Sequence, residues 1–279
     1  MRSFNETLKQ AETFLEKAEK ESRIASLLFE DMFNFEKIDF ILRGDEEIND
    51  DDFASLMKAV YLVSEGWPYQ YVTGVAHFYG NKLKVNTHTL IPRNETEELV
   101  YLVLKKVKNG TIVDIGTGTG AIGLTLKKEN PNFDIILTDI SEEALQVTKE
   151  NMGHLSVDAT LLLGDMLKPL IKNKMMVDII VSNPPYISFD EVAYMSESTL
   201  KHEPYHALFA KEDGLYFYRE IIKDLDAVLR IGGQVFFEIG FKQGSSVRDL
   251  FLSYWPNSKV EIIKDINGLD RIIYAEWVR

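Results

Sequence analysis

The sequence contains no cysteine, no long uncharged apolar run and no cluster of basic residues. Without cysteine there are no disulfides, no thiolate nucleophile and no cysteine-ligated metal site. A membrane-spanning helix needs about 18 or more apolar residues in succession, so none is expected here. The first 20 residues are charged and helically spaced, unlike a signal peptide. We therefore expect a cytoplasmic protein with no membrane partner.

Positive charge is scarce, with 31 Lys and Arg against 44 Asp and Glu, for a formal net charge of −13. The imbalance is strongest in residues 1–70, where eight basic residues face 16 acidic ones. Proteins that grip duplex nucleic acid need clustered Lys and Arg to displace the phosphate counterions. The charge therefore lowers the expectation of a direct nucleic-acid partner, and simple solubility explains the acidic surface.

The pattern of apolar residues changes twice along the chain. Residues 1–72 carry apolar side chains at helical spacing, and Asp50–Asp52 suit the start of a helix. Residues 73–92 have the pattern of a β-hairpin around the turn dipeptide Gly80-Asn81. From residue 93 onward, short apolar strands alternate with helices. We therefore expect a helical N-terminal domain (1–72), a hairpin linker (73–92) and a larger domain of alternating strands and helices (93–279).

The domain at residues 93–279 is predicted to be an α/β fold with a doubly wound, mainly parallel sheet. Strands are expected at residues 111–115, 134–138, 159–163, 177–182, 234–239, 259–264 and 271–277. Helices are expected at residues 121–130, 142–152, 214–230 and 241–252. In such a sheet, ligands bind at the carboxyl ends of the parallel strands.

A glycine-rich turn, Gly116-Thr117-Gly118-Thr119-Gly120, follows the first of these strands, and Asp114 lies two residues before it. Glycines let the backbone turn sharply and approach a ligand closely. The spacing differs from the G-x-G-x-x-G of dinucleotide sites. A carboxylate at Asp114 would repel a pyrophosphate but suits the cationic amino group or sulfonium region of S-adenosylmethionine. The loop therefore favours that cofactor.

Two further acidic residues follow the next strands. Asp139, at the tip of the second strand, could accept both hydroxyl groups of a ribose. Asp165 could accept from the adenine amino group while Met166 packs on the ring. A helix-capping role for Asp165 is an equally good interpretation of the sequence alone.

The fourth strand runs directly into Asn183-Pro184-Pro185-Tyr186. Two prolines cannot extend a strand ladder, so they fix a rigid loop and leave the Pro184 carbonyl free to accept a hydrogen bond. The Asn183 side chain offers another acceptor, and Tyr186 offers a flat face for a planar group. Two acceptors aimed at one nitrogen would hold an amide or amino group for methyl transfer. We therefore predict that Asn183, Pro184 and Tyr186 are catalytic.

The chain resembles the HemK/PrmC protein-(glutamine-N5) methyltransferases, which act on class-I peptide-chain release factors. Besides the glycine loop and Asn183–Ile187, the resemblance rests on four further groups of residues: Gln70–Gly74, Leu90–Glu97, Glu203-Pro204 with Ala207-Leu208, and Asp213–Leu215 with Tyr218, Glu238–Gly240 and Gln243. Asn94 stands where the family usually has proline.

The resemblance implies that residues 93–279 form a seven-stranded class I, Rossmann-like catalytic domain that uses S-adenosylmethionine, and that residues 1–72 recognise the substrate. No metal is expected, because His202 and His206 have no evident third ligand. The resemblance also implies that a glutamine in a Gly-Gly-Gln tripeptide of the release factor lies against Asn183, Pro184, Pro185 and Tyr186. The predicted cofactor-binding residues are Asp114, Gly116, Thr117, Gly118, Thr119, Gly120, Asp139, Ile140, Asp165, Met166 and Asn183.

Three other functions share parts of this pattern. A ribosomal-protein glutamine methyltransferase would use the same tetrapeptide with a different N-terminal domain. A nucleic-acid amino methyltransferase is disfavoured by the missing basic patch, since an enzyme that flips a base must also hold the duplex. A catalytically silent cofactor sensor would not need the intact Asn183 tetrapeptide.

Overall fold

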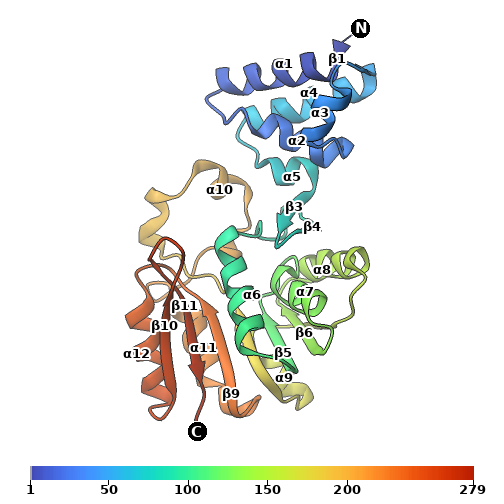
Figure 1. The fold of residues 1–279 in the computed structure, drawn as a ribbon. Helices are drawn as coiled ribbons and strands as arrows, with labels where there is room; N and C mark the ends of the chain where they lie inside the picture. The colour runs from blue at the N-terminus through green and yellow to red at the C-terminus, as the bar shows by residue number, and fades with distance from the viewer. Residues whose placement is uncertain (1) are drawn as a thin grey trace. The chain divides into compact units, whose positions relative to one another are not determined.

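The structure of the protein is a computed structural model that describes residues 2–279, and it divides into two compact units (Figure 1). The first unit contains the chain up to Val75 together with the separate segment Ser196–His202. The second contains Ala76–Met195 and Glu203–Arg279. Among the described residues, no helix combines the length and apolar character needed to cross a membrane.

The first unit is a small helical bundle. Its core contains Leu15, Leu28, Phe29, Leu56 and Val60, none of which is exposed. The elements are β1 (Arg2–Ser3), α1 (Phe4–Lys17), α2 (Ile24–Phe33), α3 (Lys37–Arg43), β2 (Glu47–Ile48), α4 (Asp50–Ser64), α5 (Tyr69–Thr73) and α10 (Glu197–His202). Helix α4 begins at the acidic triplet as predicted, because the Asn49 Oδ1 accepts from the Asp52 N–H at 2.8 Å.

Helix α10 belongs to the first unit although it lies within the sequence of the predicted catalytic domain. The Ser198 hydroxyl donates to the Gly66 carbonyl at 2.7 Å. The ring of His202 lies 4.1 Å from that of Trp67, centroid to centroid. These contacts join two segments more than 120 residues apart, so no single boundary in the sequence separates the two units.

A two-stranded hairpin, β3 (Val75–Phe78) and β4 (Asn81–Lys84), follows the helices. Its turn residues Tyr79 and Gly80 have φ values of +50° and +72°. Two successive residues with positive φ match the right-handed twist of a hairpin, which explains why Gly80 stands in the turn.

The second unit is built on a seven-stranded sheet in the order β10-β11-β9-β8-β5-β6-β7, as expected for a mostly parallel methyltransferase sheet (Figure 1). The five strands from β9 to β7 are parallel, and β11 is antiparallel to both of its neighbours. The strands are β5 (Gly110–Ile115), β6 (Phe133–Asp139), β7 (Thr160–Leu163), β8 (Val177–Ser182), β9 (Leu229–Glu238), β10 (Lys259–Lys264) and β11 (Asp270–Glu276).

Helices cover both faces of this sheet because successive strand residues point in opposite directions. Val113 belongs to a core with α9, α11 and α12, whereas its neighbour Ile112 belongs to a core with α6 and α7. The helices are α6 (Asn94–Lys106), α7 (Ala121–Glu129), α8 (Glu142–Leu155), α9 (Lys168–Asn173), α11 (Tyr216–Lys223) and α12 (Gly244–Tyr254), with short 3-10 turns at Phe189–Tyr194, Tyr205–Ala207 and Leu225–Ala227.

One predicted helix, residues 214–230, is wrong. Helix α11 ends at Lys223, a 3-10 turn follows, and β9 already begins at Leu229. The turn directs Leu225 and Val228 into the core, where neither is exposed. Gly232, with φ of +80°, lies inside β9 rather than before it, where the pairing with β8 shifts register. The glycine thus forms a bulge in a longer strand.

The parallel register brings the predicted site segments together. Ile115 of β5 lies beside Thr138 of β6 and Ser182 of β8, and Asp139 lies beside Leu163 of β7. The loops that follow these strands therefore all leave the sheet at one edge, where ligands bind in doubly wound folds.

Candidate active site

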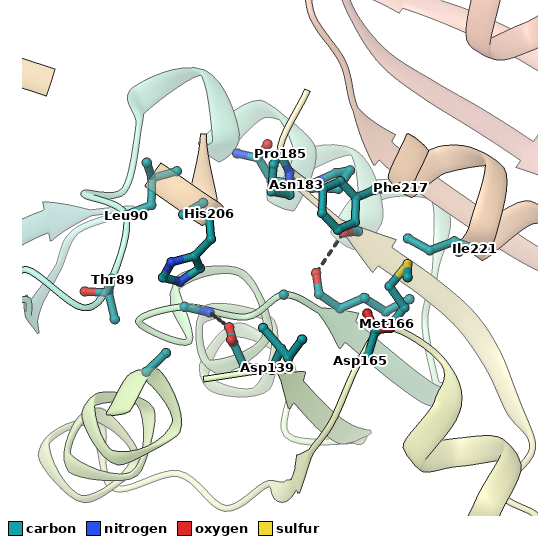
Figure 2. Close-up of a pocket in the computed structure, with 18 of the residues that line it drawn as sticks. Thr89, Leu90, Asp139, Asp165, Met166, Asn183, Pro185, His206, Phe217 and Ile221 are labelled. Carbon is teal, nitrogen blue, oxygen red and sulfur yellow. Dashed lines mark hydrogen bonds between the residues drawn. The ribbon is translucent and has the colours of Figure 1, made fainter. Parts of the chain in front are cut away.

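A cavity that is partly open to solvent lies at this carboxyl edge (Figure 2). Residues from four successive loops form its floor: Ile115, Gly116 and Gly118; Asp139 and Ile140; Gly164, Asp165 and Met166; Ser182, Asn183, Pro184 and Pro185. The structure thus gathers most of the residues singled out in the sequence around one cavity.

The glycine loop is held firmly and faces open space. The N–H groups of Gly116 and Thr117 both donate to the Thr138 carbonyl, at 2.9 and 3.0 Å. Gly116 and Gly118 have φ values of +68° and +57°, and a Cβ placed on either would meet no atom within 4 Å. The two glycines therefore leave room for a ligand to lie directly on the backbone.

Asp139 is fixed by two backbone hydrogen bonds. One carboxylate oxygen accepts from the Gly118 N–H and the other from the Ser141 N–H, both at 2.9 Å (Figure 2). The residue lines the cavity and is 9% exposed. A carboxylate oxygen can accept more than one hydrogen bond, so both oxygens can still accept from a diol.

Asp114 lies beneath the loop instead of in the cavity wall. One oxygen accepts from the Thr117 hydroxyl at 2.6 Å and from the Gly123 N–H at 3.0 Å. Burial raises the pKa of its carboxyl group to about 6, and its Oδ1 has no hydrogen-bond partner among the described residues. Asp114 therefore shapes the turn, and its contact with the cofactor stays a prediction.

Thr117, Thr119 and Gly120 are also absent from the cavity wall. The Thr119 carbonyl accepts from the Asn151 side chain at 2.9 Å. Gly120, with φ of +82°, precedes the first residue of α7. These residues belong to the glycine loop but do not line the cavity, so their predicted cofactor contacts also remain untested.

Asp165 does not cap helix α9, which has Leu167 at its N-cap and no side-chain cap. Its carboxylate pairs with Lys168, and both Asp165 and Met166 line the cavity. Of the two interpretations that the sequence left open, the structure excludes the capping role at α9. A ligand-facing role remains as a prediction.

The side chain of Asn183 is held from one side. Its Nδ2 donates to the Thr96 Oγ1 at 3.1 Å, and the Thr96 hydroxyl donates to a Glu238 carboxylate oxygen at 2.6 Å. Thr96 is 4% exposed and Glu238 is 1% exposed. Burial raises the pKa of the Glu238 carboxyl group to about 7. Sequence reasoning quoted Thr96 and Glu238 only as family residues and did not link them to Asn183.

Tyr186 lies next to the cavity without lining it. Tyr186 lines a neighbouring pocket together with Tyr194, Met195 and Phe241. Burial raises the pKa of its hydroxyl group, so the ring stays neutral. For Tyr186 to stack on a planar substrate group as predicted, that group would have to extend into the pocket that Tyr186 lines.

Gln243 fixes the backbone after the two prolines. Its Nε2 donates to the Tyr186 carbonyl at 3.0 Å, and its Oε1 accepts from the Gly240 N–H at 3.0 Å. A Cβ on Gly214 would collide with the Tyr186 carbonyl and with Gln243. The close approach of these three residues explains the glycine at position 214.

Replacing Gln243 with alanine is expected to lower kcat about fivefold to tenfold, because the part-buried Tyr186 carbonyl and Gly240 N–H lose hydrogen bonds worth roughly 0.5 kcal/mol each. The cofactor dissociation constant should change by less than about twofold, since Gln243 does not line the cavity. Steady-state kinetics and calorimetry would measure both. An unchanged kcat would contradict the supporting role of Gln243.

Eight further residues line the cavity, and the sequence did not identify any of them as a site residue. These further lining residues are His88, Thr89, Leu90, Ala144, His206, Ala207, Phe217 and Ile221. Figure 2 labels five of them: Thr89, Leu90, His206, Phe217 and Ile221. Phe217 and Ile221 are four residues apart on α11, so their shared helical face was a usable signal. The described residues contain no group of three or more His, Asp or Glu that could hold a metal ion.

An ion pair between Arg93 and Glu203 joins two parts of the chain that lie close in sequence to cavity residues Leu90 and His206. A Glu203 carboxylate oxygen accepts from the Arg93 guanidinium at 2.6 Å, and the other accepts from the Ile91 N–H at 3.3 Å. Glu203 is 6% exposed. The ion pair therefore links the chain just after Leu90 to the chain just before His206.

Two protein-family models match the chain. Residues 94–214 match the methyltransferase small domain, and residues 6–74 match the PrmC N-terminal domain.

Full-length relatives are similar throughout. The release factor glutamine methyltransferase of Bacillus subtilis is 42% identical over 282 residues, covering 99% of this chain and 98% of the relative. The protein of the same name from Staphylococcus aureus is 38% identical over 278 residues, covering 99% of this chain and all of the relative. A solved methyltransferase from Pyrococcus furiosus shares the fold, with a TM-score of 0.53 and 16% identity over 81% of this chain and 98% of its own.

Proposed function

The chain belongs to the family of release factor glutamine methyltransferases, and from that premise we propose the reaction that it catalyses. It transfers a methyl group from S-adenosylmethionine to the side-chain amide nitrogen, N5, of the glutamine in the Gly-Gly-Gln tripeptide of class-I release factors. The observation that carries this proposal is the position of Asn183 and Pro184 in the wall of the cavity above the glycine loop.

The cavity fits the proposed cofactor. Gly116 and Gly118 leave open space where a ligand can contact the backbone. Asp139 is fixed where it could accept from the ribose hydroxyls. Asp165 and Met166, on the loop after β7, are the candidates for the adenine. When bound, S-adenosylmethionine supplies an electrophilic methyl group on a sulfonium sulfur.

The protein's part in the reaction is to position and polarise a weak nucleophile. The lone pair of an amide nitrogen is delocalised into the carbonyl group, so the nitrogen attacks poorly. The Asn183 Oδ1 and the Pro184 carbonyl can accept from its two N–H groups, which raises the electron density on the nitrogen and fixes its direction of attack. The nitrogen loses one proton after it gains the methyl group, and that proton passes to water, which balances the step.

The release factor is favoured over the alternatives by the named relatives, which match this chain from end to end, including residues 6–74. A ribosomal-protein methyltransferase would be expected to differ in that N-terminal region. The 16 acidic residues among the first 70 argue against a nucleic-acid substrate. A release factor and a chain without cysteine both suit a cytoplasmic location.

The proposal is tested by incubating the full chain with methyl-labelled S-adenosylmethionine and, in parallel, with release factors, ribosomal proteins and RNA. We expect one labelled product, the release factor, with a mass gain of one methyl group on the tripeptide glutamine. A release factor whose glutamine is replaced by alanine serves as the matched control. Label on a ribosomal protein or on RNA, with none on the release factor, would overturn the proposed substrate.

A further inference from the structure

We propose that Thr96 and Glu238 are positioning residues that decide which end of the Asn183 side-chain amide faces the substrate. The inference rests on the proposed function, because it concerns how Asn183 receives the N–H groups of a substrate amide. Neither residue lines the cavity, so both act through Asn183 alone.

A primary amide such as that of Asn183 is nearly symmetric in shape. Its oxygen accepts hydrogen bonds and its nitrogen donates them, and rotation by about 180° exchanges the two ends. Only one orientation serves the reaction, since the substrate amide nitrogen needs an acceptor. With the nitrogen end toward the substrate, two donors would face each other. Something in the protein must therefore select the orientation.

The direction of one hydroxyl proton makes the selection. The Thr96 hydroxyl has a single proton, and it is donated to Glu238 at 2.6 Å. The Thr96 oxygen can then only accept, and it accepts from the Asn183 Nδ2 at 3.1 Å. The amide nitrogen is thus held toward Thr96. Among residues 2–279, no donor is bonded to the Asn183 Oδ1, which remains available to the substrate.

The fold brings these residues together from distant parts of the chain. Thr96 lies in the first turn of α6, and Glu238 is the last residue of β9. Ser182, the last residue of β8, pairs in parallel with Phe237 of β9. Asn183 and Glu238 are the residues that directly follow this pair in the chain. A 1%-exposed carboxyl group is costly to keep in a core. Its hydrogen bond to Thr96 gives it a function that an apolar residue could not supply.

The charge of Glu238 determines whether the selection works. As a carboxylate, Glu238 can only accept, which fixes the Thr96 proton. Once protonated, it can donate to Thr96, and Thr96 can then donate to the Asn183 oxygen and hold the amide in the wrong orientation. Arg271 on β11 and Arg93 favour the carboxylate, whereas burial and Glu95 favour the acid. Tyr186 and Tyr218 also face the group and stay neutral, and the Tyr218 hydroxyl donates to the Glu238 main-chain carbonyl.

The central test replaces Thr96 with valine, which keeps the shape and removes the hydroxyl group. We expect kcat for release-factor methylation to fall roughly 10- to 100-fold, as is typical when a reacting partner loses its orientation. The cofactor dissociation constant should stay close to that of the wild type, whereas the melting temperature should fall by roughly a few degrees, because the buried Glu238 carboxylate loses its hydrogen bond from Thr96. Thr96→Ser restores the hydroxyl group and should recover most of kcat. Thr125→Val is the matched control, because Thr125 is fully buried in α7 and does not line the cavity.

The second test measures kcat between pH 6 and pH 8. Protonation of Glu238 below its pKa of about 7 should lower kcat of the wild type toward pH 6. Glu238→Gln cannot ionise, so it should be slower than the wild type at pH 8 and lose this acid limb. His88 and His206 also line the cavity. They are present in both proteins, so the difference between the two profiles isolates Glu238.

The outcomes separate this inference from the proposed function. If the wild type methylates the release factor and Thr96→Val matches its kcat, the inference is overturned while the function stands. A loss in Thr96→Val that Thr96→Ser does not recover, or an equal loss of cofactor binding, also overturns it. An acid limb that persists unchanged in Glu238→Gln does the same, even if Thr96→Val fails to fold. No methylation by the wild type would instead contradict the proposed function.

Discussion

Asn183→Ala is expected to reduce kcat for release-factor methylation by roughly 1000-fold, the upper range for removing one preorganised polar contact to a reacting group. The substrate amide would lose one of its two acceptors. The Thr96 hydroxyl would also lose its partner, because it now accepts from the Asn183 Nδ2. Transfer of labelled methyl in single-turnover assays would measure the effect.

Cofactor binding should survive this substitution, since Gly116, Gly118 and Asp139 remain in place. Calorimetry should find a dissociation constant within about threefold of the wild type, equivalent to less than 1 kcal/mol. Asn132→Ala is the matched control, because Asn132 is exposed between α7 and β6. Equal losses of binding and turnover would show that the methyl acceptor does not lie at Asn183.

Asp139→Ala is expected to raise the cofactor dissociation constant about 100-fold or more. Two hydrogen bonds from ribose hydroxyls to a charged group are worth roughly 1.5–3 kcal/mol each. The loop would also loosen, because the Gly118 and Ser141 N–H groups both donate to this carboxylate. Calorimetric titration with S-adenosylmethionine or its demethylated product measures the change directly.

Asp134→Ala provides the control for this experiment. Asp134 lies on the same strand, β6, at the opposite end, and is exposed. Its removal changes the net charge by the same amount without touching the cavity, so binding should not change. A wild-type dissociation constant in Asp139→Ala would remove the ribose assignment.

The strands and their terminal loops could be predicted because local sequence determines them. Buried strands such as Val177–Ser182 are mostly apolar, and glycines or prolines follow their ends. The helix expected at 214–230 failed for a different reason. The apolar residues Leu225 and Val228 fit helical spacing, but packing against the sheet requires a 3-10 turn there. Tertiary packing therefore overrode a pattern that was locally consistent.

The site was predictable where it depends on local sequence, and not where it depends on tertiary packing. The floor of the cavity comes from strand ends, so Gly116, Asp139 and Asn183 were identified from their positions in the sequence. Two supporting contacts, Arg93–Glu203 and Thr96–Glu238, were missed because each joins residues that are far apart in the sequence. Arg93 and Glu203 are 110 residues apart, and Thr96 and Glu238 are 142 apart. A single sequence holds no signal for such pairs, since nothing in the local pattern around either residue names its distant partner.

The assignment of Ser196–His202 to the helical unit affects how the protein can be dissected. The backbone passes between the two units at three points: after Val75, after Met195 and after His202. A catalytic fragment cut at residue 75 would therefore retain a loop whose docking partners, Gly66 and Trp67, had been discarded. Truncation would disturb the backbone between Tyr186 and Glu203, so a loss of activity in such a fragment would not by itself report on substrate recognition.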